Sequence, residues 1–167
     1  METKIPFYNL LNMFLTGLIF IGCCVLLYHN KIITFVESNF FKSVKDINVG
    51  LETVITISFC AIIYEIGLII NRIGSLLENL LKECPILLPF DDDHKKFSEK
   101  KKQFPIMEIL SREYALSRTS MTLFLITTVI ACFQKHWIFS IVMFVLTLIF
   151  YFSMKKHAGK IVELMKD

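Results

Sequence analysis

Four long apolar runs dominate this sequence, and their lengths match the thickness of a lipid bilayer. The first, residues 7–28, contains no charged residue, and the second, residues 53–71, is interrupted only by Glu65. Residues 119–133 and 137–154 form two further runs with a short polar segment between them. A helix of roughly 20 apolar residues crosses a hydrocarbon core of about 30 Å. The pattern therefore predicts an all-α integral membrane protein with four transmembrane helices.

The amino-acid composition excludes an ordinary soluble domain. Hydrophobic residues make up 54% of the chain, phenylalanine accounts for 16 of 167 residues, and the mean hydropathy is +0.59. The first run is also longer than the apolar part of a cleaved signal peptide, which has roughly 7 to 15 residues, and only Lys4 precedes it as a basic residue. We therefore expect it to remain in the mature chain as the first span.

The distribution of lysine and arginine predicts the side of the membrane on which each loop lies. If the N-terminus is cytoplasmic, 14 of the 18 basic residues are also cytoplasmic, and only Lys31, Lys42, Lys45 and Lys135 lie outside. Cytoplasmic loops carry the excess of positive charge, so we expect both termini in the cytoplasm. The predicted division of the chain is a transmembrane hairpin at 1–71, a cytoplasmic helical region at 72–118, a second transmembrane hairpin at 119–154 and a cytoplasmic tail at 155–167.

The cytoplasmic region should contain two amphipathic helices that extend the second and third spans. In "NRIGSLLENLLKECP", apolar residues recur at helical spacing until Pro85 ends the helix. A second helix from Ile106 should feed the third span, whose own start we expect near Leu116, with Arg118 reaching toward the membrane interface. Two such helices cannot bury their apolar faces alone in so small a segment. They should pack against each other and against other copies, which predicts a homo-oligomer.

The loop between the first two spans carries the aromatic stretch "FVESNFFKSV". Its Phe35, Phe40 and Phe41 are typical of an interfacial helix that lies on the bilayer. Membrane lipid is therefore the partner expected for this segment.

No catalytic or nucleotide-binding motif is recognisable. The patterns GxSxG, HExxH and GxxxxGK[ST] are absent, and the five cysteines lack the spacing of a zinc ligand set or a redox pair. The nearest candidate is "DDDH", residues 91–94, which could hold a hard cation through adjacent carboxylates or simply form a solvated turn that caps the next helix. We expect no enzymatic activity and no cofactor.

Glu65 is the most informative single residue, because an ionisable group at membrane depth costs several kcal/mol unless it faces protein or water. It could bond a polar neighbour such as Tyr64 or a hydroxyl of the third span, line a pore in an oligomer, or act in proton transfer. Arg72 follows two turns later on nearly the same stripe. In the first span, Asn12 and Thr16 form a second polar stripe suited to hydrogen bonding between helices or to a pore.

A basic group in the cytoplasmic region is the candidate ligand site. Aspartates and Glu99 dilute this group, so it could serve only to fix the topology, or it could attract an anionic lipid or nucleic acid. Phe97 and Phe104 lie among the lysines, and such a mixture of cations and rings is used by proteins that bind single strands. The candidate residues are Lys95, Lys96, Lys100, Lys101, Lys102, Arg112 and Arg118.

Three segments resemble a group of small bacterial four-span proteins that includes the membrane effectors of the Hailong anti-phage defence system. They are "IPFYNLLNMFLTGLIFIG", "YEIGLIINRIGSLLENLL" and "EYALSRTSMTLF", which occur in this order over most of the chain. The resemblance implies a tetrameric channel in the bacterial inner membrane. It further implies that single-stranded oligo-deoxyadenylate, made by a partner nucleotidyltransferase, keeps the channel closed until infection. The diluted lysine run departs from a strong DNA site, which puts the ligand in question.

Three functional classes therefore compete. A gated ion channel explains the intramembrane acid, the oligomerising helices and the lack of catalytic motifs together. A non-conducting membrane anchor or assembly subunit explains everything except the position of Glu65. An intramembrane enzyme is barely supported, because no second ionisable group lies within the spans to form a proton relay.

Overall fold

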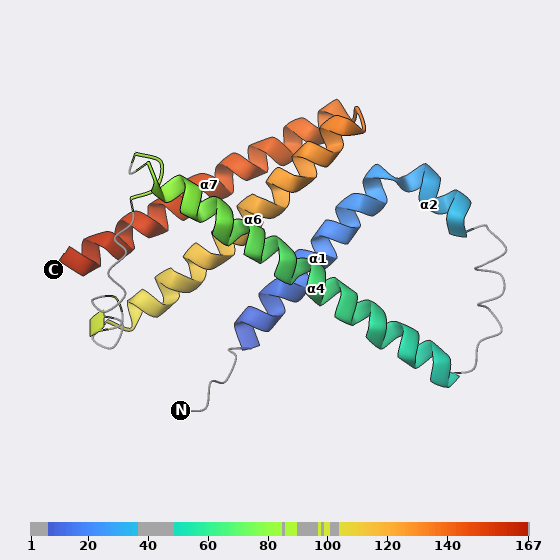
Figure 1. Ribbon diagram of the computed structural model, residues 1–167, viewed down its shortest axis with the longest axis horizontal. Helices are drawn as coiled ribbons and strands as arrows, with labels where there is room; N and C mark the ends of the chain where they lie inside the picture. Colours follow the sequence, from blue (N-terminus) through green and yellow to red (C-terminus); the bar gives the residue numbers. More distant parts are fainter. Residues whose placement is uncertain are drawn as a thin grey trace.

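The computed structural model describes residues 7–36, 49–84, 86–89, 97, 99–100 and 104–166, and all regular structure within them is helical (Figure 1). Four of the helices are long and apolar enough to cross a membrane, which confirms the predicted membrane class. The helices are α1 (Phe7–Leu27), α2 (His29–Val36), α4 (Val49–Lys82), α6 (Ile106–Phe133) and α7 (Trp137–Lys166).

The long helices run alternately in opposite directions (Figure 1). The starts of α1 and α6 lie toward the same end of the molecule as the ends of α4 and α7. The end of α1 and the turn between α6 and α7 lie toward the other end. Four successive crossings of a membrane require this alternation. Helices α6 and α7 form one long antiparallel hairpin, while α4 crosses α1 obliquely.

Two glycines allow α1 and α4 to touch backbone to backbone. A Cβ atom built on Gly17 would lie 1.8 Å from the carbonyl oxygen of Ile63, and one on Gly67 would lie 1.8 Å from that of Met13. Neither position can hold a side chain unless the helices separate. Gly22, about one and a half turns closer to the end of α1 than Gly17, has open space around it. In lipid there is no hydrophobic driving force between helices. Small residues at such crossings let the helices approach closely, so that van der Waals packing holds them together.

Helix α6 is the most buried of the four long helices, and it carries one serine and four threonines inside the bundle. Four of its threonine hydroxyls donate to the carbonyl four residues earlier at 2.8 to 3.0 Å. These bonds satisfy hydroxyl groups that would otherwise be costly to bury. The four are Thr119, Thr122, Thr127 and Thr128.

A methionine-rich core joins the first half of α6 to the second half of α7. The sequence predicts an apolar face of Ile106, Met107, Leu110 and Tyr114 for this helix. The last three are buried here against α7, whereas Ile106 is exposed. The segment expected as a tail continues α7 as far as Lys166. Its contribution to the core is Met154, Ala158, Ile161 and Met165.

The short segment after α4 also contributes to this core. Leu88 is buried in this core. Two side chains of α7 hold the backbone just before it: Tyr151 donates to the carbonyl of Leu87 at 2.9 Å, and Lys155 donates to that of Ile86 at 2.7 Å. The end of α4 is thereby fixed to the hairpin.

Both predicted helical extensions are continuous with their spans. Helix α4 has 34 residues, or about 51 Å at 1.5 Å per residue, so it is longer than the hydrocarbon core. Helix α6 begins at Ile106 and runs unbroken through Leu116, where the third span was expected to start. In the loop between the first two spans, α2 includes Phe35, whereas Phe40 and Phe41 lie outside the described residues.

Candidate functional site

Helix α4 carries a row of polar residues on the face turned away from the rest of the chain. Ser58, Glu65, Arg72 and Asn79 are all exposed and occur at every seventh position. Seven residues bring a helix to within about 20° of two full turns, so these side chains share one face, which we call the outer stripe. Exposed apolar residues separate them: Ile62, Ile69 and Leu76.

The two charges of the outer stripe have no partner among the described residues. Tyr64 lies on another side of α4, and the buried threonines of α6 direct their hydroxyls to carbonyls of their own helix, with Thr119 also bonding Asn71. The packing contact considered for Glu65 from the sequence is therefore not formed among the residues that the structure describes. Lipid is a poor environment for this carboxylate.

The opposite face of α4 is buried against the other helices. Its residues are Ile63, Gly67, Ile70, Gly74 and Glu78, which we call the inner stripe. A Cβ atom on Gly74 would lie 2.9 Å from Oγ1 of Thr122, so a side chain of α6 packs directly on the backbone of α4 here.

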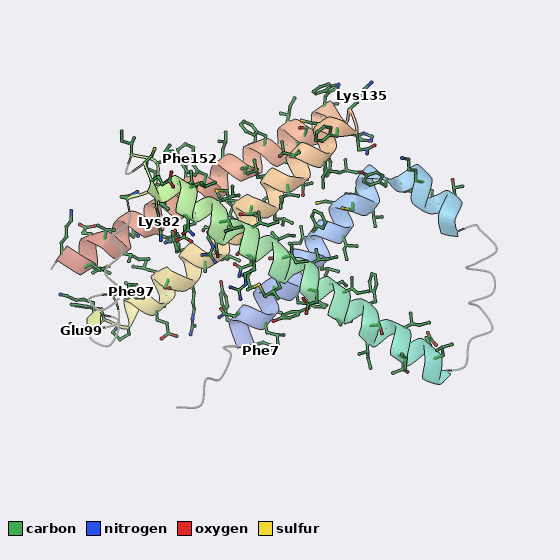
Figure 2. The ribbon with its side chains drawn as sticks, in the orientation of Figure 1. Phe7, Lys82, Phe97, Glu99, Lys135 and Phe152 are labelled. Carbon is green, nitrogen blue, oxygen red and sulfur yellow. The ribbon has the colours of Figure 1, made fainter. Side chains whose placement is uncertain are left out.

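A polar network fixes α4 to α6 at the end of the inner stripe. Arg118 donates to Oε2 of Glu78 at 2.5 Å and to Oδ1 of Asn71 at 2.9 Å, and Thr119 donates to the same amide oxygen at 2.9 Å. Nζ of Lys82 lies 3.0 Å from Oε1 of Glu78. Figure 2 shows Lys82 where the end of α4 passes over the hairpin.

Glu78 is charged in this network. It lies beyond Asn71, where the predicted second span ends. Burial would raise the pKa of its carboxyl, but hydrogen bonds and charges from Arg118 and Lys82 hold the pKa below its ordinary value. Only 8% of its side chain and 16% of the Arg118 side chain are exposed, so solvent screens the pair weakly.

The predicted ligand residues are only partly brought together. Lys95, Lys96, Lys101 and Lys102 lie outside the described residues, as does the "DDDH" segment at 91–94. Within the described part of the chain, no group of histidine, cysteine or acidic side chains is arranged to hold a metal ion.

The other three ligand candidates are described. Lys100 lies over the ring of Phe104, with 5.5 Å from Nζ to the ring centroid. Arg112 is exposed, pairs with Glu108, and lies 5.9 Å from the ring centroid of Tyr8 on α1. Arg118 is occupied by the network, so it is poorly placed to take a ligand. Phe97 and Glu99 lie close to the start of α6 (Figure 2).

The polar stripe of α1 is satisfied mainly within its own helix. Thr16 is buried, and its hydroxyl donates to the carbonyl of Asn12 at 2.8 Å. Interhelical hydrogen bonding, which the sequence indicated for this pair, is instead made by Asn71 with Arg118 and Thr119.

Comparison with protein-family models, curated proteins and solved structures finds no match to this chain.

The network generates a prediction about stability. Replacing Arg118 by methionine leaves Glu78 with Lys82 alone and removes a donor from Asn71, so we expect a loss of about 3 kcal/mol of unfolding free energy. Arg112→Met breaks an exposed pair of the same kind and should cost below about 1 kcal/mol. Titration of the detergent-solubilised chain with denaturant measures both.

The pH dependence follows from the lowered pKa of Glu78. Its contribution is fully present above the ordinary carboxyl pKa of about 4.3 and disappears as the pH falls through the lower pKa of the folded state. Glu78→Gln should therefore remove part of the acid-induced destabilisation seen in the natural chain. Equal costs for the two arginine variants, together with an unchanged pH profile for Glu78→Gln, would contradict this account.

Proposed function

We propose that this chain is the subunit of a homo-oligomeric, gated ion channel in the bacterial inner membrane, with the outer stripe of α4 facing a shared axis. The observation that carries the proposal is the position of Glu65 and Arg72, which are exposed and unpartnered among the described residues on a helix apolar enough to span the membrane. Arranging copies around an axis turns both charges away from lipid and toward water.

The inner stripe supports this orientation. The contacts of Gly67 with α1 and of Glu78 with α6 bind α4 to its own subunit through one face. The opposite face is then free to line the axis along most of the helix. The resemblance to Hailong effectors implies that four copies assemble.

The two charged rings of such an oligomer would act in series. Seven residues separate Glu65 from Arg72, or about 10 Å along the helix. A ring of carboxylates favours cations. The arginine ring, toward the end of the helix that continues past the predicted span, would oppose their passage, so Glu65 would set the ion preference and Arg72 would limit the current.

Gating would act through the helical extensions. Both α4 and α6 continue beyond their predicted spans, and the polar network of Asn71, Glu78, Lys82, Arg118 and Thr119 joins them. A polyanion bound near Lys100 and Arg112 could hold both spans in the closed arrangement, provided that it binds this arrangement more tightly than the open one. By resemblance, the polyanion is single-stranded oligo-deoxyadenylate and the channel is an anti-phage effector.

A non-conducting anchor is the second candidate. It is favoured by the first third of α4, residues 51–62, in which every residue is exposed. Such a surface could serve only to pack against other subunits of a larger complex. The role of Glu65 in permeation separates the two candidates.

Glu65→Gln tests the channel directly. The change removes the charge but keeps the size of the side chain, so the oligomer should persist while the preference for cations over anions falls severalfold. The measurements are planar-bilayer reversal potentials and the mass of the detergent-solubilised oligomer. Glu163→Gln, at an exposed acid of α7, is the matched control and should leave both unchanged. An intact Glu65→Gln oligomer with natural currents would refute the pore assignment.

The ligand makes a separate prediction. Labelled oligo-deoxyadenylate should bind the purified oligomer at low salt, with a slope of about −0.7 in log K against log salt for each phosphate neutralised. Changing Lys100, Lys101 and Lys102 to glutamine should flatten that slope and make expression toxic, because the closed state loses its ligand.

The matched control for the ligand is the same change at three exposed lysines of α7, Lys156, Lys160 and Lys166. It removes equal charge and should leave the slope unaltered. Absence of binding at low salt, or equal effects of the two triple changes, would contradict the ligand proposal. The lysines would then serve only to fix the membrane topology.

A further inference from the structure

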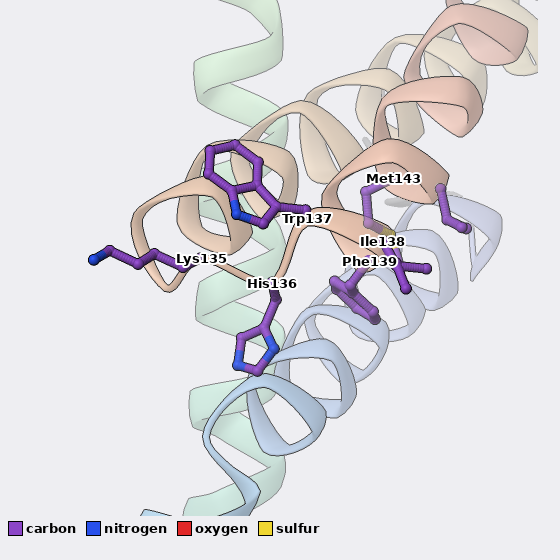
Figure 3. Close-up of a pocket in the computed structure, with 7 residues that line it drawn as sticks. Lys135, His136, Trp137, Ile138, Phe139 and Met143 are labelled. Carbon is purple, nitrogen blue, oxygen red and sulfur yellow. The ribbon is translucent and has the colours of Figure 1, made fainter.

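Two adjoining cavities lie where the end of α1 meets the turn between α6 and α7. One, of about 550 Å³, is lined by residues 135–139 with Val142 and Met143 (Figure 3). The other, of about 350 Å³, is lined by residues 26–29, Lys31, Gln134 and His136. His136 lines both, and Figure 3 shows its ring directed toward the end of α1, away from Trp137. The cavities are therefore two parts of one site.

The wall between α1 and the turn is held in place by hydrogen bonds. Gln134 donates to the hydroxyl of Tyr28 at 2.8 Å, which connects the end of α1 to the turn. Lys135 occupies a left-handed conformation with φ of 61°, and the amide of His136 donates to the carbonyl of Ala131 at 3.0 Å. This backbone geometry points Lys135 outward and turns His136 inward (Figure 3).

The polar end of the site is suited to an anion. Nζ of Lys31 lies 5.6 Å from the ring centroid of Tyr28, which holds the ammonium group beside the smaller cavity. His29 and His136 also line this smaller cavity. No carboxylate lines either cavity in the described part of the chain. A phosphate group could therefore accept several hydrogen bonds here without meeting a competing negative charge.

The other end of the site is apolar and follows α7 along the membrane. Phe139, Val142 and Met143 line the larger cavity over about one turn of the helix. Helix α1 has 21 residues, or about 31 Å, so its end beside the turn lies at the level of the lipid headgroups if α1 spans the bilayer. A donor-rich pocket at headgroup depth with an apolar wall below it matches the two parts of a phospholipid.

We propose that this site binds a phospholipid with a net negative headgroup, whose phosphate contacts Lys31 and His136 and whose acyl chain lies along Phe139, Val142 and Met143. Tryptophan and lysine at a membrane interface anchor many proteins without selecting a lipid. Two features distinguish this site: His136 lines both cavities, and no acidic residue lines either of them in the described part of the chain. The proposal does not depend on channel activity.

Lipid selectivity of the full-length chain tests the polar end. The purified oligomer is exchanged into detergent containing equal amounts of phosphatidylglycerol and phosphatidylcholine, and native mass spectrometry gives the ratio of the two lipids retained. The natural chain should favour phosphatidylglycerol. Combining Lys31→Gln with His136→Ala should lower that preference about fivefold, as expected for losing one cation at a lipid surface. Lys160→Gln, an exposed lysine of α7 toward the opposite end, should not change it.

A second pair of variants tests the acyl-chain end. Val142→Trp fills the larger cavity and should reduce retention of phosphatidylglycerol. Val145 is as exposed as Val142 but does not line the cavity, so Val145→Trp should have no effect. Circular dichroism confirms that all variants keep their helices.

Competition with inorganic phosphate is the last experiment. It distinguishes a lipid site from a site for free phosphate, which would use the same donors. If the lipid occupies both parts of the site, excess phosphate should displace little phosphatidylglycerol. The proposal is overturned by the absence of lipid preference in the natural chain, by complete displacement with phosphate, or by equal effects of the two tryptophan variants.

Discussion

The buried ion pair between Glu78 and Arg118 determines which face of α4 turns inward. Desolvating two charges is unfavourable unless both are well bonded. Here Lys82 also pairs with Glu78, and Asn71 also accepts from Arg118. The pair therefore tolerates no rotation of α4 about its axis. Since α4 is continuous from Val49 to Lys82, fixing one end fixes the face presented along the whole helix. The direction of Glu65 follows from that constraint.

The glycine crossing provides the second fixed point of α4. Backbone contact at Gly17 and Gly67 holds α4 against α1 near its middle, while the ion pair holds its end against α6. Between them the inner stripe is buried, but residues 51–62 extend beyond the crossing with every side chain exposed. In a bilayer only lipid or other subunits can cover that part. A subunit with about a third of one long helix uncovered is well suited to assembly around an axis.

Much of the fold could be predicted because lipid simplifies the problem. Length and apolarity alone identify the four long helices, and the spacing of Met107, Leu110 and Tyr114 identifies a buried face. The helical end of α7 is also visible in the sequence, because Met154, Ala158, Ile161 and Met165 carry the same kind of periodicity. The seven-residue spacing of Ser58, Glu65 and Asn79 is a further such pattern.

The candidate site was less predictable, because its decisive contacts join distant residues. Arg118 near the start of an apolar run has the same sequence pattern whether it reaches for headgroups, a ligand or a buried acid. Its partner Glu78 lies 40 positions away, and only the packing of α4 on α6 brings them together. Thr16 shows the converse, since a hydroxyl that could bond another helix bonds its own carbonyl. Polar stripes alone do not distinguish these outcomes.

The central claim is that position 65 faces water on a shared axis, and accessibility of a thiol measures it most directly. The five natural cysteines are replaced by serine or alanine, and Glu65→Cys is reconstituted in planar bilayers. A charged, membrane-impermeant methanethiosulfonate should react with it rapidly and change the current. Phe144→Cys, an exposed position on α7, should react slowly because lipid covers it. Equally slow reaction at both positions, with no change in current, would contradict the account.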